Sequence, residues 1–254
     1  MHERLNIFGL NIHHIRFRDA ITQVMELGFN QTPSFVCFAN VHMTIEAYKD
    51  PGFAKKVNKA TLVLADGNPL ISAFRLLYHK KQERIAGMDF LPGLLDAINQ
   101  GHFRIFLYGS SKEVLDALQK KITKKYAAVE IAGAISPPFR PLSPEELQHV
   151  TDQINESGAH IVFVSLGCPK QENWMFANHQ KINAVLLGVG GAFRVTAGLQ
   201  KRAPVWMQKI SMEWSYRLIQ EPGRLFKRYL VTNSIFVWLL NKAVVKKIWY
   251  GFAK

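Results

Sequence analysis

Short runs of apolar residues alternate along this chain with stretches in which apolar positions recur every three or four residues. The apolar runs predict strands at residues 34–39, 61–65, 103–108, 127–132, 160–166 and 184–189. Helical patterns lie at residues 69–78, 111–125, 143–157 and 170–180, and another helix is expected near Leu91. Near-continuous apolar strands separated by helices are typical of a parallel sheet covered on both faces. The pattern therefore predicts an α/β fold in which helices flank a parallel sheet.

Polar or glycine-rich segments follow directly on several of these strands. They are Asn40, Asp66-Gly67, Gly109-Ser110-Ser111, residues 167–172 (GCPKQE) and residues 188–191 (GVGG), which include Gly190. The carboxyl ends of parallel strands lie at one edge of the sheet, where α/β proteins bind their ligands. We therefore expect these segments to converge on a single site.

The last part of the chain is helical and basic, so we divide the chain into a core (1–198) and a C-terminal appendage (199–254). The appendage has eleven Lys or Arg against two Glu, a net charge of +9 out of +13 for the whole chain, and four of the five Trp. Basic residues interleaved with aromatic ones suit the headgroup region of an anionic membrane, where each Lys or Arg contributes about 1 kcal/mol. The alternatives are a helical pair that packs its aromatic side chains on the core, or nucleic-acid binding, for which no groove-reading motif is present.

Two features of the chain limit its location. The N-terminal residues have no apolar stretch of signal-peptide length, and the longest uncharged run near the C-terminus, residues 229–241, has 13 residues. A membrane-spanning helix needs about 20. Cys37 and Cys168 lie in or beside apolar runs, without the spacing of metal ligands, as expected for buried thiols in a reducing compartment. We expect a cytoplasmic protein whose membrane contact is peripheral.

Asp66 is the first candidate for chemistry. An acid after a strand serves either as a helix N-cap or turn former, or as a general base whose pKa is raised by burial. The pattern alone leaves both open. Arg84 precedes the helix expected near Leu91, and a lone arginine of this kind is ordinarily solvated.

Two further segments are candidates for binding phosphate or sugar. Gly109 and Ser110 open a helix after a strand, and such a helix start offers backbone N–H groups to an anion. The full GxGxxG spacing is lacking, so a plain strand-to-helix turn fits equally well. In GCPKQE, Lys170 is placed to meet phosphate and Gln171 to hydrogen-bond a sugar or base, whereas Glu172 fits a favourable interaction with the helix dipole.

No Asp-x-Asp sequence occurs, although a metal that bridges a nucleotide-sugar diphosphate typically needs such carboxylates. If the substrate is a nucleotide sugar, basic side chains and helix N-termini must stabilise the departing diphosphate.

Several motifs together resemble the WecG/TagA/CpsF glycosyltransferases: LADGNPL (64–70), RIAGMD (84–89), GCPKQE (167–172), GVGGAF (188–193), AGLQKRAP (197–204) and EWSYRLIQEPGRLFKRYL (213–230). They occur in the family order. The resemblance implies a Rossmann-like core with a membrane-binding appendage at the inner face of the cytoplasmic membrane. It implies inverting transfer of a sugar from a UDP-sugar to a polyprenyl-diphosphate-linked sugar, without metal or other cofactor. Family members build teichoic-acid linkage units, enterobacterial common antigen or exopolysaccharides.

The resemblance also assigns roles to individual positions. Asp66 matches the proposed catalytic base, and Asn40 matches an asparagine near the acceptor sugar. Arg84 matches an arginine that holds diphosphate, and Gln171 a glutamine of the active-site pocket. In the appendage, Arg217 and Arg224 match arginines that reach the lipid diphosphate and complete the site.

This chain departs from the family pattern in two places. Phe38 stands where many members have Thr, and Arg194 stands where many have Asp, which reverses a charge at the expected rim of the pocket. Pro69, in the form ADGNPL, is more similar to the exopolysaccharide branch than to the mannosaminyltransferase branch.

Two other functions fit the sequence less well. An oxidoreductase on a similar sheet lacks its GxGxxG sequence after the first strand. A non-enzymatic module that binds membrane or nucleic acid leaves the polar strand ends unexplained. Self-association through the apolar appendage is a further expectation, and we expect no nucleic-acid partner.

Overall fold

A six-stranded sheet runs through the part of the chain that the computed structural model describes, residues 2–209 and 212–252. Its strands are β3 (Ser34–Ala39), β4 (Leu62–Ala65), β5 (Arg104–Gly109), β6 (Glu130–Ile135), β7 (Ile161–Ser165) and β8 (Val185–Gly188). The spatial order is β4-β3-β8-β7-β5-β6, and every neighbouring pair is parallel. All the carboxyl ends therefore lie at one edge. A separate antiparallel hairpin pairs β1 (Arg4–Ile7) with β2 (Leu10–His13).

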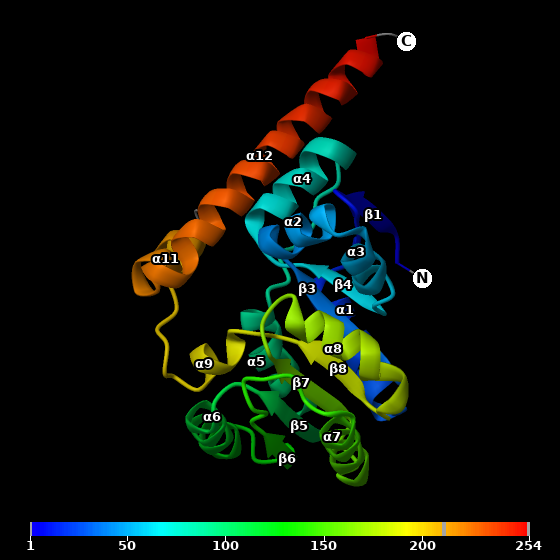
Figure 1. Cartoon of the computed structure of the whole chain (residues 1–254), viewed down its shortest axis with the longest axis vertical. Helices are drawn as coiled ribbons and strands as arrows, with labels where there is room; N and C mark the ends of the chain where they lie inside the picture. The colour runs from blue at the N-terminus through cyan, green and yellow to red at the C-terminus, as the bar shows by residue number, and fades with distance from the viewer. Residues whose placement is uncertain (1, 210–211, 253–254) are drawn as a thin grey trace.

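Helices cover both faces of this sheet (Figure 1). One layer contains α1 (Phe17–Phe29), α5 (Gly87–Ile98), α6 (Lys112–Lys125) and α9 (Ala192–Thr196). The other contains the hairpin, α2 (Val41–Lys49), α3 (Pro51–Asn58), α4 (Asn68–Tyr78), α7 (Pro144–Glu156) and α8 (Lys170–Asn178), which a 3-10 turn (His179–Lys181) extends.

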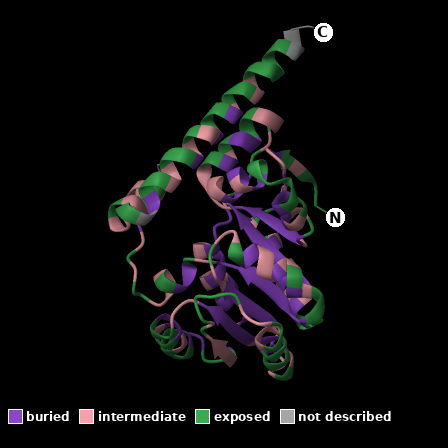
Figure 2. Ribbon diagram, viewed as in Figure 1, coloured by how far each residue is buried: buried purple, intermediate pink, exposed green. Residues whose placement is uncertain are grey.

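Two hydrophobic cores result, one on each face of the sheet. Along β3, Val36 and Phe38 point into one core and Phe35 and Cys37 into the other, so every residue of the strand is buried. This explains why the strands other than β6 are continuous apolar runs in the sequence, and Figure 2 shows them as buried.

The appendage consists of α10 (Val205–Lys209), α11 (Glu213–Gln220) and α12 (Pro222–Phe252). Helix α12 packs on α2 and α4, and its far end projects beyond the core (Figure 1). Phe236 and Leu239 anchor it in the core, where the Phe236 ring meets the Phe8 ring edge-on with centroids 5.4 Å apart. No helix among the described residues is long and apolar enough to cross a membrane.

The predicted fold class, a parallel α/β sheet flanked by helices with a helical C-terminal segment, is confirmed. One strand is misplaced: the run at 127–132 predicted a strand, whereas β6 spans Glu130–Ile135. This edge strand is only partly buried, so its apolar pattern is weak. The helix expected near Leu91 begins at Gly87, and the N-terminal hairpin and α1 to α3 had no predicted counterpart. The division at residue 198 stays a prediction.

Candidate active site

The ends of β3 and β4 place Asn40 next to Asp66. Ala39 and Ala65 are paired in register, and the Asp66 N–H donates to the Ala39 carbonyl at 2.7 Å. Asn40 caps α2, since its Oδ1 accepts the Met43 N–H at 3.1 Å. The two residues that directly follow these neighbouring strands therefore lie side by side at the carboxyl edge of the sheet.

Asp66 is an unusually basic carboxylate. Burial raises its pKa from the ordinary 3.8 to about 6, because the charged form loses hydration there. Arg84 opposes this effect and Glu213 adds to it, with smaller contributions from Arg217, which lowers the pKa, and Asp89, which raises it. The Asp66 residue as a whole is half-buried.

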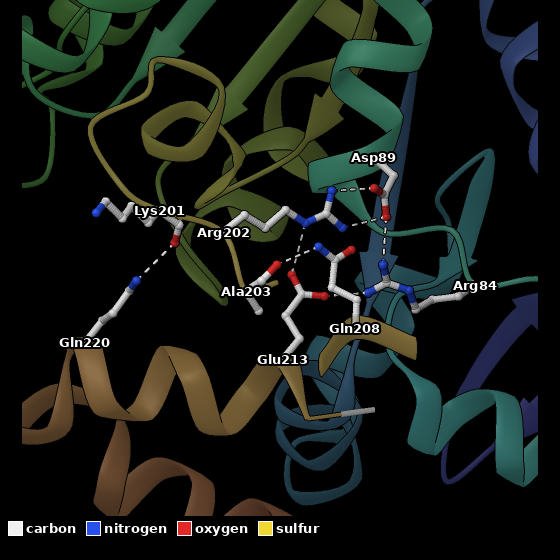
Figure 3. A network of polar contacts seen from close by, with 8 residues as sticks. All are labelled: Arg84, Asp89, Lys201, Arg202, Ala203, Gln208, Glu213 and Gln220. Carbon is white, nitrogen blue, oxygen red and sulfur yellow. Dashed lines mark hydrogen bonds and ion pairs between the residues drawn. The ribbon is translucent and has the colours of Figure 1, made fainter. Parts of the chain in front are cut away.

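Three of the charged side chains that act on Asp66, those of Arg84, Asp89 and Glu213, form a closed ring of ion pairs with Arg202 (Figure 3). Arg84 donates to Asp89 at 2.8 Å and to Glu213 at 2.9 Å. Arg202 bridges the same two acids, at 2.5 Å to Asp89 and 3.4 Å to Glu213. Arg84 and Asp89 belong to the core and the other two to the appendage. The ring therefore joins the appendage to the core beside Asp66.

Arg217 of α11 also faces the core. A Cβ added at Gly191 would lie 3.3 Å from its Nη2, so its guanidinium lies against the glycine-rich turn after β8. Its Nε is buried and has no hydrogen-bond partner among the described residues. Its charge acts on Asp66, as its effect on the pKa of Asp66 shows. Arg224 lies in α12, but its side chain is outside the described part of the chain.

Gln171 ties neighbouring strand ends together instead of pointing freely into a pocket. Its Nε2 donates to the Gly188 carbonyl at 2.9 Å and to Glu172 at 2.7 Å, and its Oε1 accepts the Gly167 N–H at 3.3 Å. A Cβ added at Gly190 would lie 3.5 Å from that same Oε1. Glu172 is fully buried, and burial raises its pKa. Lys170, in contrast, is exposed at the start of α8.

The turn at Gly109 and Ser110 lies farther along the edge. Both residues have positive φ, +107° and +64°, and the Ser110 N–H donates to the Ser165 carbonyl at 2.9 Å. β5 is four strand positions from β4, which is about 19 Å at the usual strand spacing. The structure therefore brings Asn40, Asp66, Arg84 and Arg217 together, puts Gln171 and Gly190 in the middle of the edge, and leaves Gly109 and Ser110 apart from Asp66.

A sequence model described as the Glycosyl transferase WecG/TagA/CpsF family matches residues 5–249. The match includes every strand end described above and most of the appendage. The chain belongs to this family of glycosyltransferases. The predictions of the family and of an enzyme that transfers a sugar are thus confirmed, and the oxidoreductase and non-enzymatic alternatives are set aside.

Relatives of this WecG/TagA/CpsF glycosyltransferase include three enzymes named N-acetylglucosaminyldiphosphoundecaprenol N-acetyl-beta-D-mannosaminyltransferase. The one from Bacillus subtilis (strain 168) is 34% identical over 212 residues, which cover 83% of this chain and 80% of the relative. The one from Bacillus spizizenii is 33% identical over 75% of this chain and 73% of the relative. The one from Staphylococcus aureus (strain MW2) is 26% identical over 94% and 93%. Pro69 indicates the exopolysaccharide branch, whereas these three relatives are named as mannosaminyltransferases.

The two departures of this glycosyltransferase from the family pattern lie in different surroundings. Phe38 is buried in the core, where its ring meets that of Phe90 with centroids 5.1 Å apart. An apolar ring therefore packs in the core at the position where many family members have the polar residue Thr. Arg194 is exposed on α9, where its charge is free to act on the surface.

Among the residues that the structure describes, no group of three or more His, Cys, Asp or Glu is placed to hold a metal ion. Transfer without a metal stays a prediction for this glycosyltransferase.

Sequence reasoning missed three members of the ring, Asp89, Arg202 and Glu213, although each lies in a motif that carried the resemblance. Glu213 and Arg84 are 129 positions apart, and Arg202 and Asp89 are 113 apart. Only the docking of the appendage pairs them. The one signal in the sequence is that the motifs RIAGMD and AGLQKRAP each contain charged residues.

Proposed function

We propose that this glycosyltransferase transfers an N-acetylmannosaminyl group from its UDP-sugar to N-acetylglucosaminyl-diphosphoundecaprenol, with inversion and without a metal. The names of the three relatives support this donor sugar and this acceptor. The UDP carrier, the inversion and the absence of metal follow from the family resemblance. The two arginines near Asp66, Arg84 and Arg217, are compatible with them.

The observation that carries the proposal is the environment of Asp66. A base is most effective when its pKa is close to the working pH, and burial brings the pKa of Asp66 to about 6. In the proposed reaction the acceptor hydroxyl gives its proton to Asp66 while its oxygen attacks the anomeric carbon. The bond from that carbon to the UDP oxygen breaks, and UDP leaves with the electron pair.

Arginine side chains supply the positive charge that the departing diphosphate needs. Arg217 is well placed, because its guanidinium lies against the glycine-rich turn after β8 and its Nε has no hydrogen-bond partner among the described residues. Arg84 would bind diphosphate while also paired with Asp89 and Glu213. We assign Arg224 and Lys170 to the same task.

The remaining candidates would bind the sugars and the nucleotide. Asn40 lies beside Asp66, where the acceptor hydroxyl must come, so we assign it to the acceptor sugar. Gln171 and Gly190 would form the floor of the pocket. Gly109 and Ser110 lie about 19 Å along the edge at the usual strand spacing, a position that suits the far end of an extended donor.

The appendage would bring the enzyme to its lipid acceptor. It exposes large apolar side chains in α10, α11 and α12, namely Val205, Trp206, Trp214, Ile219, Phe226, Leu230, Val237, Trp238, Val245, Ile248 and Trp249. Basic residues lie among them. We propose that this surface rests on the anionic inner face of the cell membrane as a peripheral contact.

The test measures UDP release from a panel of UDP-sugars with a short-chain prenyl-diphosphate-linked N-acetylglucosamine, in the presence of EDTA. We expect release only when UDP-N-acetylmannosamine and the acceptor are both present. Asp66→Asn should lower kcat by at least about a hundredfold, the lower range for loss of a general base. Asp116→Asn, an exposed acid on α6, is the matched control and should behave as wild type. Near-normal turnover by Asp66→Asn would contradict the assignment.

A further inference from the structure

The ring of ion pairs contains three residues, Asp89, Arg202 and Glu213, to which the reaction above gives no task. All four members of the ring are largely withdrawn from solvent, with side-chain exposures of 22% for Arg84, 34% for Asp89, 23% for Arg202 and 16% for Glu213. Glu213 is thus the least exposed acid of the ring, and it comes from the appendage.

The geometry of the ring fixes the plane of the Arg84 guanidinium. Nη1 donates to Glu213 and Nη2 donates to Asp89, so the two ends of the fork are held by two different carboxylates (Figure 3). Arg202 in turn bridges both carboxylates and prevents either from turning away. A guanidinium held in this way cannot turn toward another side-chain carboxylate without breaking one of these two bonds.

Asp66 is such a carboxylate, because the Ile85 N–H donates to the Ala65 carbonyl at 2.8 Å and so places Arg84 beside Asp66. The charges that act on it come from the segment before α5 (Arg84), from α5 (Asp89) and from α11 (Glu213 and Arg217). Without Glu213, one end of the Arg84 fork would lose its partner next to a buried carboxylate. An ion pair between Arg84 and Asp66 would then hold Asp66 in its charged form and make it a weaker base.

We propose that Glu213 is a positioning residue of the transfer reaction, which holds Arg84 away from Asp66, and that Asp89 and Arg202 hold Glu213 and Arg84 in this arrangement. The proposal rests on the proposed role of Asp66 as the base. It also gives the docked appendage a task in the chemistry beyond supplying positive charge, because the carboxylate of Glu213 reaches the site only when α11 is docked.

The test compares Glu213→Gln with wild type in the UDP-release assay across pH 4.5 to 9. Glutamine keeps the size and the hydrogen-bonding capacity of the side chain and removes its charge. We expect kcat to fall about tenfold or more with little change in KM, and the acidic limb of the kcat profile to move to lower pH. Glu213→Asp should restore part of kcat and the wild-type limb. Glu156→Gln, an exposed acid at the end of α7, is the control for the loss of one charge.

Asp89→Asn carries the same test if Glu213→Gln does not fold, because Asp89 holds the other end of the Arg84 fork. A wild-type kcat and an unmoved limb in these variants would overturn the proposal. So would a loss of activity that only follows the loss of folded protein in a thermal melt, with the limb unmoved. Asp66→Asn in the same assay distinguishes the failure of the Glu213 proposal from the failure of the proposed role of Asp66. If Asp66→Asn is inactive while Glu213→Gln is normal, only the positioning role of Glu213 fails. If it is active, both proposals fail.

Discussion

Asn40 and Asp66 follow two neighbouring parallel strands at the same level, and the hydrogen bond from the Asp66 N–H to the Ala39 carbonyl, 2.7 Å long, fixes them there. Asn40 has a structural task in addition to its proposed one, since its side chain caps α2. Substitutions at Asn40 must therefore separate the stability of α2 from the binding of the acceptor sugar.

Asn40→Ser makes this separation, because serine is also a favoured N-cap while it lacks the amide group. We expect a melting temperature close to wild type and a kcat/KM for the acceptor lower by about three- to tenfold, the usual effect of one hydrogen bond to an uncharged group. Asn40→Ala is the comparison that also loses the cap, at a cost of about 1 kcal/mol. An unchanged kcat/KM in Asn40→Ser would mean that Asn40 acts only as a cap.

Asp66 should lower the stability of the protein at neutral pH. Because its pKa is raised in the folded state, the protein loses stability as the pH rises from about 4 to about 6, where Asp66 ionises in its buried position. Asp66→Asn removes this effect, so we expect it to be more stable than wild type at pH 8, by up to about 3 kcal/mol. The difference should vanish below pH 4. Denaturant unfolding at several pH values measures it, and a variant less stable than wild type at pH 8 would contradict the buried, basic state of Asp66.

Much of the core was predictable from the sequence, because its strands are buried on both faces and therefore form unbroken apolar runs. β3, β4, β5, β7 and β8 were all placed in this way. The pattern failed at the partly buried edge strand β6 and at the hairpin of β1 and β2, whose strands have only four residues each. The convergence of Asn40 and Asp66 followed from parallel strands alone.

The ring of ion pairs that includes Arg84 could not be predicted from the sequence, for a different reason. The pairs that join its two halves link residues more than a hundred positions apart, and the described part of the appendage that supplies Arg202 and Glu213 contains no strand that could place it. Gln171 shows a related limit. Its place in the active-site pocket stays a prediction, whereas the bonds from its polar atoms to Gly167, Glu172 and Gly188 could not be predicted from the sequence.

The outer part of α12 makes the membrane contact testable apart from the chemistry. Trp238 and Trp249 are 56% and 75% exposed, and the Lys242 ammonium lies 5.1 Å from the centre of the Trp238 ring. An amphipathic tryptophan flanked by lysine is well suited to the level of the lipid headgroups.

The double variant Trp238→Gln and Trp249→Gln should bind vesicles containing anionic lipid about tenfold or more weakly than wild type, because two large apolar side chains no longer enter the interface. Flotation with and without 0.5 M salt measures this, and wild-type binding itself should weaken at high salt because the Lys and Arg charges are screened. Phe29→Gln on α1, where Phe29 is 73% exposed, is the matched control and should bind as wild type. Equal binding by all three proteins would show that the exposed tryptophans of α12 are not the membrane contact, and a lower melting temperature of the double variant would show that they pack within the protein instead.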